Sequence, residues 1–421
     1  MDLYDELEWR GMLSEATDGL RDALAASRLT AYIGFDPTAD SLHVGSLLTV
    51  MGLARLQRFG HAPIAIVGGG TGMIGDPSGK SQERTLLSRE QIDANVAGIR
   101  RQLERFLDFE HSANPARIVN NADWLAAFDL LGFLRDTGKY FTVNYMLQKE
   151  SVNRRLESEE GISYTEFSYL LLQARDFLEL FDRYGCTLQM GGSDQWGNIT
   201  AGIELIRKLR GVRVHGLVWP LMTTSAGTKF GKTEAGTVWL DAVRTSPFKF
   251  YQFWLNTDDR DVVGYLKLFT FLAREPIEDL ARATAARPEA REAQRTLARE
   301  VTALVHGPEH VQRAERASHV LFSEKVAEAS VEDVLTVFED APSTELSLPP
   351  DGMPIAELLA AVRLTPSKSE AMRLLKSGGV YINNVRATDE RQRLTVADAI
   401  GGELFILRKG RKDHHIVRLR R

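Results

Sequence analysis

The sequence predicts an α/β fold in which a parallel β-sheet with crossover helices is followed by an all-helical segment and a small α+β unit. Short apolar runs alternate with helix-length stretches through about residue 222, as in parallel strands joined by helices. Residues 247–321 have a helical pattern without a convincing strand, and residues 351–421 mix two helix-like stretches with short strand-like runs. With 421 residues, the chain is long enough for two or three domains.

The elements of the first half alternate in type. The expected strands are residues 30–35, 63–69, 117–121 and 187–192, and the expected helices are residues 44–59, 88–107 and 172–180. Ligands of such sheets bind beyond the carboxyl ends of the strands. The segments that directly follow strands, residues 34–46, 68–84 and 191–198, are therefore the candidate site.

The second half contains a connector, helices, a linker and a tail. Residues 340–354 are rich in Pro, Ser and Asp, which is typical of a linker. In the tail we expect helices at 355–362 and 367–378 and strands at 379–383, 403–410 and 414–421. The domain boundaries that follow are 1–222, 223–246, 247–325, 326–350 and 351–421.

Composition and charge narrow the class of protein. A single cysteine, Cys186, excludes a disulfide scaffold and favours a reducing, cytoplasmic setting. No apolar run approaches the roughly 18 residues of a membrane span, and the acidic start does not resemble a signal peptide. Residues 351–421 carry 14 Lys or Arg against 8 Asp or Glu, leaving 38 against 49 for the rest of the chain. A basic tail indicates either a polyanionic partner or a solvated basic face.

A glycine-rich loop at residues 68–81 resembles two nucleotide motifs and fits neither. Gly70, Gly72 and Gly75 match the dinucleotide pattern G-x-G-x-x-G, but that pattern must open a helix, and the stretch GDPSG interrupts one. Only three residues separate the glycines before Lys80 where a P-loop has four. What remains is a loop that can fold over a polyphosphate, with Lys80 and Arg84 as its cations.

Two further segments predict anion binding. His43 stands where the helix of residues 44–59 starts, and helix N-termini attract anions because their first N–H groups lack partners. In residues 227–237, Lys229 and Lys232 are spaced by three among Gly and Thr, so both ammonium groups can reach one small anion. Taken alone, the second segment is an ordinary surface loop.

Together, the H-x-G-x helix start and the K-x-x-K-[ST] loop resemble the signature pair of class I aminoacyl-tRNA synthetases, and within that class the bacterial tyrosyl-tRNA synthetase family. The resemblance rests on several separate segments and continues through the tail. These segments are YIGFDPTADSLHVG, AIVGG, GDPSGK, ERTL, TEFSYLLLQARDF, GGSDQWGNITAG and KFGKTEAGT.

The resemblance implies a fold and an activity. The fold would be a Rossmann-like doubly wound catalytic domain, a mobile loop of the KMSKS type, an all-helical domain on the anticodon side and an S4-like RNA-binding domain. The activity would be ATP-dependent activation of L-tyrosine and transfer of the tyrosyl group to tRNA(Tyr). MgATP, tyrosine and tRNA(Tyr) would be the ligands, with no metal bound by the protein itself, and the enzyme would be a cytoplasmic homodimer.

The resemblance also implies roles for individual residues. Tyr32 would donate to the tyrosine hydroxyl and Asp176 accept from it, while Thr38 and His43 would bond the γ-phosphate region and Gly45 lie against adenine. The implied catalytic residues are Thr38, His43, Lys80, Arg84, Lys229, Lys232 and Thr233. The implied tyrosine-binding residues are Tyr32, Asp76, Tyr169, Gln173, Asp176 and Gln195. The implied ATP-binding residues are Gly34, Asp36, His43, Gly45, Ser46, Thr49, Gly192, Asp194 and Lys232. The implied tRNA-binding residues are Lys368, Arg373, Lys376 and Arg386.

The spacing within one helix supports part of this assignment. Tyr169, Gln173 and Asp176 stand at i, i+4 and i+7, so a single helix face presents all three side chains. Two positions depart from the family pattern: Ser46 replaces a second histidine, and Ile33 stands where relatives often carry a polar or thiol side chain. Both departures affect nucleotide contacts and leave the phosphate-binding cations in place.

Several alternatives stay open at this level. The tryptophanyl enzymes share the class, although they would not be expected to pair Tyr32 with Asp176. An RNA-binding or splicing-type protein that kept the fold and lost activation is a second alternative. Residues 414–421 could be a solvated edge strand. For the aromatic run at 248–255 we expect core or a dimer contact in preference to a platform for a nucleobase.

Overall fold

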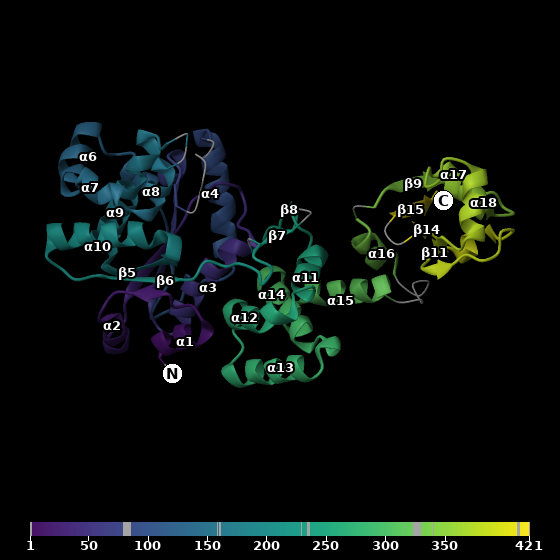
Figure 1. Ribbon diagram of the computed structural model, residues 1–421, viewed down its shortest axis with the longest axis horizontal. Coiled ribbons are helices and arrows are strands. Elements are labelled where there is room, and N and C mark those ends of the chain that lie inside the picture. The colour runs from purple at the N-terminus through teal and green to yellow at the C-terminus, as the bar shows by residue number, and fades with distance from the viewer. Residues whose placement is uncertain are drawn as a thin grey trace. The chain divides into compact units, whose positions relative to one another are not determined.

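The computed structural model (Figure 1) describes residues 2–78, 86–157, 159, 161–228, 230–233, 236–322, 330–339, 341–410 and 413–420. The chain forms two compact units, one of Met1–Ser246 with Gln252–Val305 and one of Pro247–Tyr251 with His306–Arg421. Residues 247–325, expected as one helical domain, are therefore divided between the two compact units. The boundaries taken from the sequence stay predictions.

A six-stranded sheet forms the centre of the first unit, in the order β1-β6-β5-β2-β3-β4. The strands after β1 run parallel, and β1 pairs antiparallel with β6. Their bounds are β1 Glu15–Ala16, β2 Thr30–Phe35, β3 Ala62–Val67, β4 Arg117–Asn120, β5 Cys186–Gly192 and β6 His215–Trp219. From β2 the chain proceeds outward through β3 and β4, then returns to the other side with β5 and β6. The doubly wound prediction is therefore confirmed, and the strand order reverses between β2 and β5, where ligands of such sheets bind.

Helices cover both faces of the sheet. The Tyr32 ring lies 5.3 Å from that of Phe177 on α9 (Tyr164–Tyr184). The next residue, Ile33, lies toward Gly52 of α3 (Val44–Arg58), where a Cβ would stand 3.6 Å from Ile33 Cδ1. Because successive residues of a strand point to opposite faces, α9 and α3 lie on opposite sides of β2. All of β3 is buried, as expected for a strand covered on both faces.

Local sequence sets the ends of these helices. The Ser163 hydroxyl accepts from the N–H of Glu166 to begin α9, and Gly185 ends it in the left-handed conformation. Ser88 and Gln91 form a capping box that begins α4, Arg89–Leu103. The other helices around the sheet are α1 Leu3–Arg10, α2 Leu20–Ala26, α5 Ala122–Leu125, α6 Leu130–Asp136, α7 Val143–Leu147, α8 Glu150–Leu156 and α10 Trp196–Arg210.

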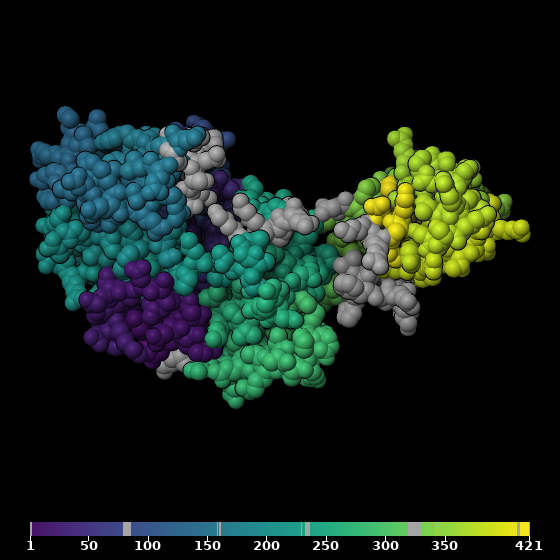
Figure 2. Space-filling model, in the orientation of Figure 1, coloured from purple at the N-terminus to yellow at the C-terminus, as the bar shows by residue number. Residues whose placement is uncertain are grey.

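The connector after β6 carries a short hairpin of β7 (Lys232–Thr233) and β8 (Gly236–Thr237). The predicted helices follow: α11 Pro247–Leu255, α12 Asp259–Phe269, α13 Arg274–Ala286, α14 Glu292–His306 and α15 Pro308–Phe322. Figure 2 shows the N-terminal segment, in purple, against the green helical segment of the same unit, in agreement with the contact between α1 and α12. The aromatic run of α11 is core in its described part, since Phe250, Tyr251 and Trp254 are at most 2% exposed.

The second unit contains a five-stranded sheet in the order β12-β11-β14-β15-β9, together with a two-stranded sheet of β10 and β13. The helices and strands expected in the tail are present. The helices are α16 Val331–Val337, α17 Ile355–Ala361 and α18 Lys368–Lys376. The strands are β9 Ser343–Leu346, β10 Met353–Pro354, β11 Val380–Ile382, β12 Val385–Arg386, β13 Arg393–Leu394, β14 Leu404–Lys409 and β15 Asp413–Leu419.

One expectation and one open alternative about this unit are wrong. Residues 326–350, the segment expected as a linker between the helical domain and the tail, contain α16 and β9, and β9 pairs parallel with β15. Consequently β15 is an inner strand, not a solvated edge. The Pro and Ser residues that indicated a linker flank a four-residue strand whose side chains alternate in exposure, and so short an element leaves little periodic signal.

Candidate active site

A cavity of about 550 Å³ opens where β2 and β5 end in the first unit. Every predicted tyrosine- or nucleotide-site residue whose side chain the structure describes lines this cavity. These residues are Tyr32, Gly34, Asp36, Thr38, His43, Gly45, Ser46, Thr49, Asp76, Tyr169, Gln173, Asp176, Gly192, Asp194 and Gln195. Lys80, Arg84 and Lys229 fall outside the described residues, and Lys232 and Thr233 are described only as backbone of β7. The roles of all these residues remain predictions.

Asp176 and Tyr32 form a buried polar end of the cavity. The Asp176 carboxylate is 3% exposed and accepts from Trp124 Nε1 at 2.7 Å and from Asn121 Nδ2 at 2.9 Å. Burial raises the pKa of Asp176 to about 7, against the lowering effect of those two hydrogen bonds. The Tyr32 hydroxyl, on a side chain 1% exposed, has no hydrogen-bond partner among the described residues. A ligand hydroxyl can accept from a buried donor such as Tyr32 and donate to a buried acceptor such as Asp176.

A chain of hydrogen bonds connects Asp176 to the side of the cavity at the end of β2. Asn121 Nδ2 also donates to Thr71 Oγ1 at 3.0 Å, and that hydroxyl donates to Asp36 Oδ1 at 2.8 Å. The Tyr169 hydroxyl donates to Asp36 Oδ2 at 2.9 Å. Burial, followed by the charge of Asp36, raises the pKa of Tyr169 well above its usual value, so the phenol stays a neutral donor.

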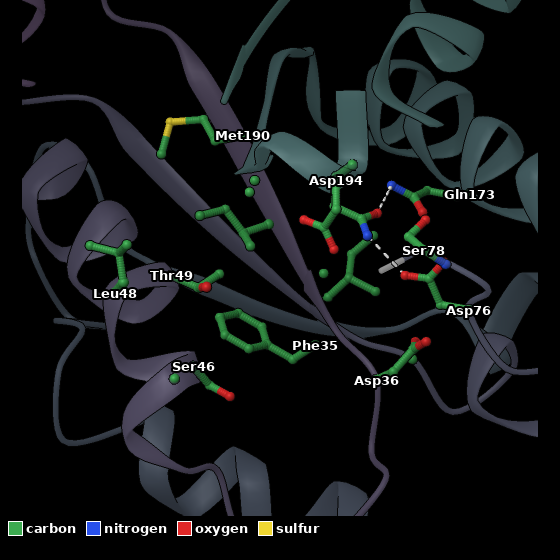
Figure 3. A pocket seen from close by; sticks show the side chains of 18 of the residues that line it. Phe35, Asp36, Ser46, Leu48, Thr49, Asp76, Ser78, Gln173, Met190 and Asp194 are labelled. Carbon is green, nitrogen blue, oxygen red and sulfur yellow. Dashed lines mark hydrogen bonds between the residues drawn. The ribbon is translucent and has the colours of Figure 1, made fainter. Parts of the chain in front are cut away.

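Asp76 and Gln173, both labelled in Figure 3, form a second polar cluster with Gln195. The three side chains come from three separate segments. Gln195 Nε2 donates to Asp76 Oδ2 at 2.8 Å, and Gln173 Nε2 donates to Gln195 Oε1 at 3.2 Å. Asn198 Nδ2 donates to Gln173 Oε1 at 3.0 Å, and the N–H of Ser78 donates to Asp76 Oδ1 at 2.9 Å. Two carboxylates, Asp76 and the nearby Asp36, make this part of the cavity suitable for a small cation such as an ammonium group.

Sequence reasoning missed several of these side chains, because a polar residue after a strand or on a helix is common. Asn121 directly follows β4, which was the one available signal, whereas Trp124 on a four-residue helix gave none. The cavity or network residues that were missed are Thr71, Ser78, Asn121, Trp124, Gln189 and Asn198. The spacing argument on α9, in contrast, is confirmed: Tyr169, Gln173 and Asp176 all line the cavity.

The N-terminus of α3 forms the opposite side of the cavity. His43 occupies its N-cap position, and Gly45 follows in the first turn. A Cβ on Gly45 would stand 2.8 Å from Cε1 of His43, so any other residue there would displace the imidazole. Ser46 and Thr49 continue along the same helix and also line the cavity.

The connector that carries β7 lies against this helix start. The N–H of Val44 donates to the carbonyl of Val238 at 3.0 Å, and the N–H of Leu240 donates to that of Leu42 at 2.8 Å. Gly231, with φ of +81°, directly precedes Lys232, and a Cβ on it would stand 2.7 Å from Val44 Cγ2. The backbone of Lys232 is therefore held beside the helix that begins after His43.

Comparisons with known proteins agree with the family resemblance found in the sequence. The family model for class I tRNA synthetases (W and Y) matches residues 24–323, and that for the "Tyrosine--tRNA ligase SYY-like C-terminal domain" matches residues 333–417. A tyrosine--tRNA ligase of Roseiflexus castenholzii is 57% identical over 99% of both chains. The chain belongs to the tyrosyl-tRNA synthetase family.

Other tyrosyl-tRNA synthetases agree with the assignment. The Geobacillus stearothermophilus tyrosine--tRNA ligase is 52% identical over 99% of this chain and 100% of its own length. The solved structure of a C-terminally truncated mitochondrial tyrosyl-tRNA synthetase from Aspergillus nidulans superimposes with a TM-score of 0.69 at 32% identity, covering 76% of this chain and 94% of that chain. The class I resemblance found in the sequence is confirmed.

The predicted tRNA-binding residues lie on the second unit. Lys368, Arg373 and Lys376 are exposed on α18, and Arg386 is exposed on β12, where its Nε donates to the carbonyl of Gly378 at 2.8 Å. Lys368 and Lys376 also make ion pairs, with Glu357 at 3.0 Å and Glu390 at 3.7 Å. Arg408, stacked 3.7 Å from the Tyr381 ring centre, is a further basic group that the sequence did not single out.

Two other expectations concern groups away from the cavity. His415 donates to or accepts from Thr344 Oγ1 at 2.9 Å, and the His414 ring lies 5.0 Å from that of Phe338. Over the described part of the chain, no group of three His, Cys, Asp or Glu side chains is arranged to hold a metal ion. Within the same residues, no helix is long and apolar enough to cross a membrane.

Proposed function

We propose that this chain activates L-tyrosine with ATP and transfers the tyrosyl group to tRNA(Tyr). The observation that carries the proposal is the buried end of the cavity, where Tyr32 offers a donor and Asp176 an acceptor, in a chain that is 57% identical to a tyrosine--tRNA ligase over its length. A ligand ring with a hydroxyl satisfies both groups. A ring without one leaves the buried Tyr32 hydroxyl unpaired, at a cost of about 1–3 kcal/mol, and removes the donor that Asp176 would gain beside Asn121 and Trp124.

The reaction has two steps. A carboxylate oxygen of tyrosine attacks the α-phosphorus of ATP, and the bond to the pyrophosphate oxygen breaks. A ribose hydroxyl at the 3′ end of the tRNA then attacks the activated carbonyl carbon, loses its proton, and AMP leaves. Mg²⁺ enters with ATP as part of the substrate. Positioning and stabilisation of the charge that develops on the phosphates supply the rate.

The amino acid binds on the α9 side of the cavity. Tyr32 donates to its hydroxyl and Asp176 accepts from it, while Asp76, Tyr169 and Gln173 surround its ammonium group. The hydrogen bonds of Gln195 to Asp76 and Gln173 support this arrangement, because they fix both side chains before tyrosine arrives.

ATP binds on the α3 side. His43 and Thr38 contact the terminal phosphates, and the missing Cβ of Gly45 lets adenine approach the backbone. The remaining proposed nucleotide contacts are Gly34, Asp36, Ser46, Thr49, Gly192 and Asp194. Lys80, Arg84, Lys229, Lys232 and Thr233 surround the leaving pyrophosphate. The packing of Gly231 against Val44 supports the assignment of Lys232 to this phosphate-binding group, because it holds the adjacent backbone beside the start of α3.

The second unit binds tRNA(Tyr) through Lys368, Arg373, Lys376 and Arg386, and the enzyme works in the cytoplasm as a homodimer. Apolar side chains at the α6–α9 end of the first unit support the dimer. Leu130, Leu131 and Val143 are 70%, 76% and 60% exposed, and Tyr164 is 72% exposed. Exposed apolar side chains mark an interaction surface where they form one contiguous patch. Sedimentation analysis tests this part of the proposal.

Exchange of labelled pyrophosphate into ATP tests the activation step. We expect exchange that depends on tyrosine, with phenylalanine and tryptophan far below it. Exchange with tryptophan in preference to tyrosine would assign the chain to the tryptophanyl branch. RNA binding without exchange for any amino acid would mean that the fold serves RNA alone.

A further inference from the structure

Phe230, the residue between Lys229 and Gly231, lies in a socket of aromatic rings. Its side chain is 8% exposed and lines the cavity. The ring stacks on Phe269 at 5.2 Å with an interplanar angle of 16° and meets Tyr265 edge-on at 4.9 Å. Phe253 and Trp254 close the socket, each with its ring centre 5.8 Å from that of Phe230. These four ring contacts fix the position of the Phe230 side chain.

The socket is tied to α3, the helix whose N-terminus faces the cavity. Tyr265 and Phe269 belong to α12, and the last carbonyls of that helix accept hydrogen bonds from a buried arginine of α3. Arg55 Nη2 donates to the carbonyl of Leu268 at 2.7 Å and to that of Thr270 at 2.8 Å. A cation that bonds the last carbonyls of a helix stabilises its C-terminus. The socket therefore keeps a fixed relation to α3.

The backbone next to Phe230 returns to the other end of α3. The carbonyl oxygen of Phe230 lies 3.9 Å from the place where a Cβ would stand on Gly45, and Gly231 packs against Val44. Phe230 is therefore connected to α3 twice. Its backbone lies next to the start of that helix, and its ring packs on α12, which is hydrogen-bonded to Arg55 near the end of α3. Because of these two connections, the position of the ring sets the position of the backbone at Lys232.

We propose that Phe230 is a positioning residue for tyrosyl-adenylate formation: its seat in the aromatic socket places the backbone from which Lys232 extends against the start of α3. The inference rests on the function proposed above and assigns Phe230 no contact with the reacting atoms. A misplacement of about 1 Å in such a segment can cost about 100-fold in rate. Tyrosine binds on the α9 side, so its affinity does not depend on the socket.

The test compares Phe230→Leu with Phe141→Leu in the full-length protein. Phe141 is also 8% exposed and belongs to the core next to α9 and α10, so its truncation controls for loss of buried apolar surface. Tyr265→Leu changes the socket from its other side. For each variant one measures thermal unfolding, the dissociation constant for tyrosine, and the single-turnover rate of adenylate formation at saturating tyrosine and ATP.

We expect Phe230→Leu and Tyr265→Leu to lower the single-turnover rate by about tenfold or more while the tyrosine dissociation constant stays within about twofold. Phe141→Leu should lower the unfolding temperature with a smaller change in rate. The proposal is overturned if the socket variants lose no more rate than Phe141→Leu, or if their tyrosine affinity falls as far as their rate. Adenylate formation by the unsubstituted protein, measured in the same assay, decides the proposed function separately.

Discussion

The N–H of Val44, the first residue of α3, donates to the carbonyl oxygen of Val238 at 3.0 Å. This bond joins two segments that are almost 200 residues apart in the chain and that carry the two halves of the signature found in the sequence. It places the connector with Lys232 beside the helix that begins after His43. The proposed phosphate site depends on that junction.

Asp176→Asn tests the recognition of the tyrosine hydroxyl. The substitution keeps the side-chain size but replaces one acceptor oxygen by a donor, which then faces Asn121 or Trp124. We expect tyrosine affinity to fall by at least about 1–3 kcal/mol, as measured by equilibrium dialysis. Thermal unfolding checks that the variant is folded at the temperature used. Unchanged tyrosine affinity in a folded variant would remove Asp176 from this role.

The same carboxyl group predicts a pH dependence of stability. Its pKa is raised to about 7 in the folded protein, against about 3.9 in an unfolded chain. Between these values the folded state binds more protons than the unfolded state, so the contribution of Asp176 to the free energy of unfolding falls as pH rises. The contribution of Asp176 to the free energy of unfolding changes by at most about 1.4 kcal/mol per pH unit.

Denaturant unfolding from pH 4 to pH 8 checks this dependence, with Asp176→Asn as the reference that lacks the titrating group. The difference in the free energy of unfolding between the two proteins should change with pH up to the folded-state pKa of about 7 and level off above it. A difference that stays constant would mean that Asp176 is ionised throughout.

Gly231→Ala tests the contact between the connector and α3. A Cβ there would stand 2.7 Å from Val44 Cγ2 at a positive φ. Gly227→Ala is the matched control, because its φ of +78° imposes similar backbone strain and a Cβ would meet nothing within 4 Å. We expect both variants to lose about 1–2 kcal/mol of stability and only Gly231→Ala to slow adenylate formation markedly in single-turnover assays. Equal rates for the two variants would contradict the account of the junction.

Truncation after α15, which removes most of the second unit, separates activation from transfer. The cut must precede α16, since removal of residues 351–421 alone would take away β15, the strand with which β9 pairs. A chain ending at residue 322 should retain pyrophosphate exchange with tyrosine and lose charging of tRNA(Tyr), because exposed basic groups of the second unit supply phosphate contacts. Loss of exchange would show that the second unit supports the catalytic fold instead.

Much of the site could be predicted from local pattern. The i, i+4, i+7 spacing on α9 placed Tyr169, Gln173 and Asp176 on one face, since helical periodicity depends on sequence alone. The partners of Asp176 could not be found this way. Asn121 and Trp124 follow β4, and only the pairing of β3 with β4 brings them to α9.

The wrong expectations have the same cause. The linker prediction fails at β9 because a four-residue strand between prolines carries almost no periodic signal, and the position of this strand depends on parallel pairing with β15. The two-residue strand β1, which was not predicted, forms only because it pairs with β6. Short elements of this kind are fixed by tertiary contacts.

The most direct test of the central claim is the single-turnover rate of tyrosyl-adenylate formation in Lys80→Ala and Lys232→Ala, with saturating tyrosine and ATP. If cations from both segments stabilise the leaving pyrophosphate, each variant should lose about 100-fold or more in rate and retain the tyrosine affinity of the unsubstituted protein. An undiminished rate in either variant would contradict the account.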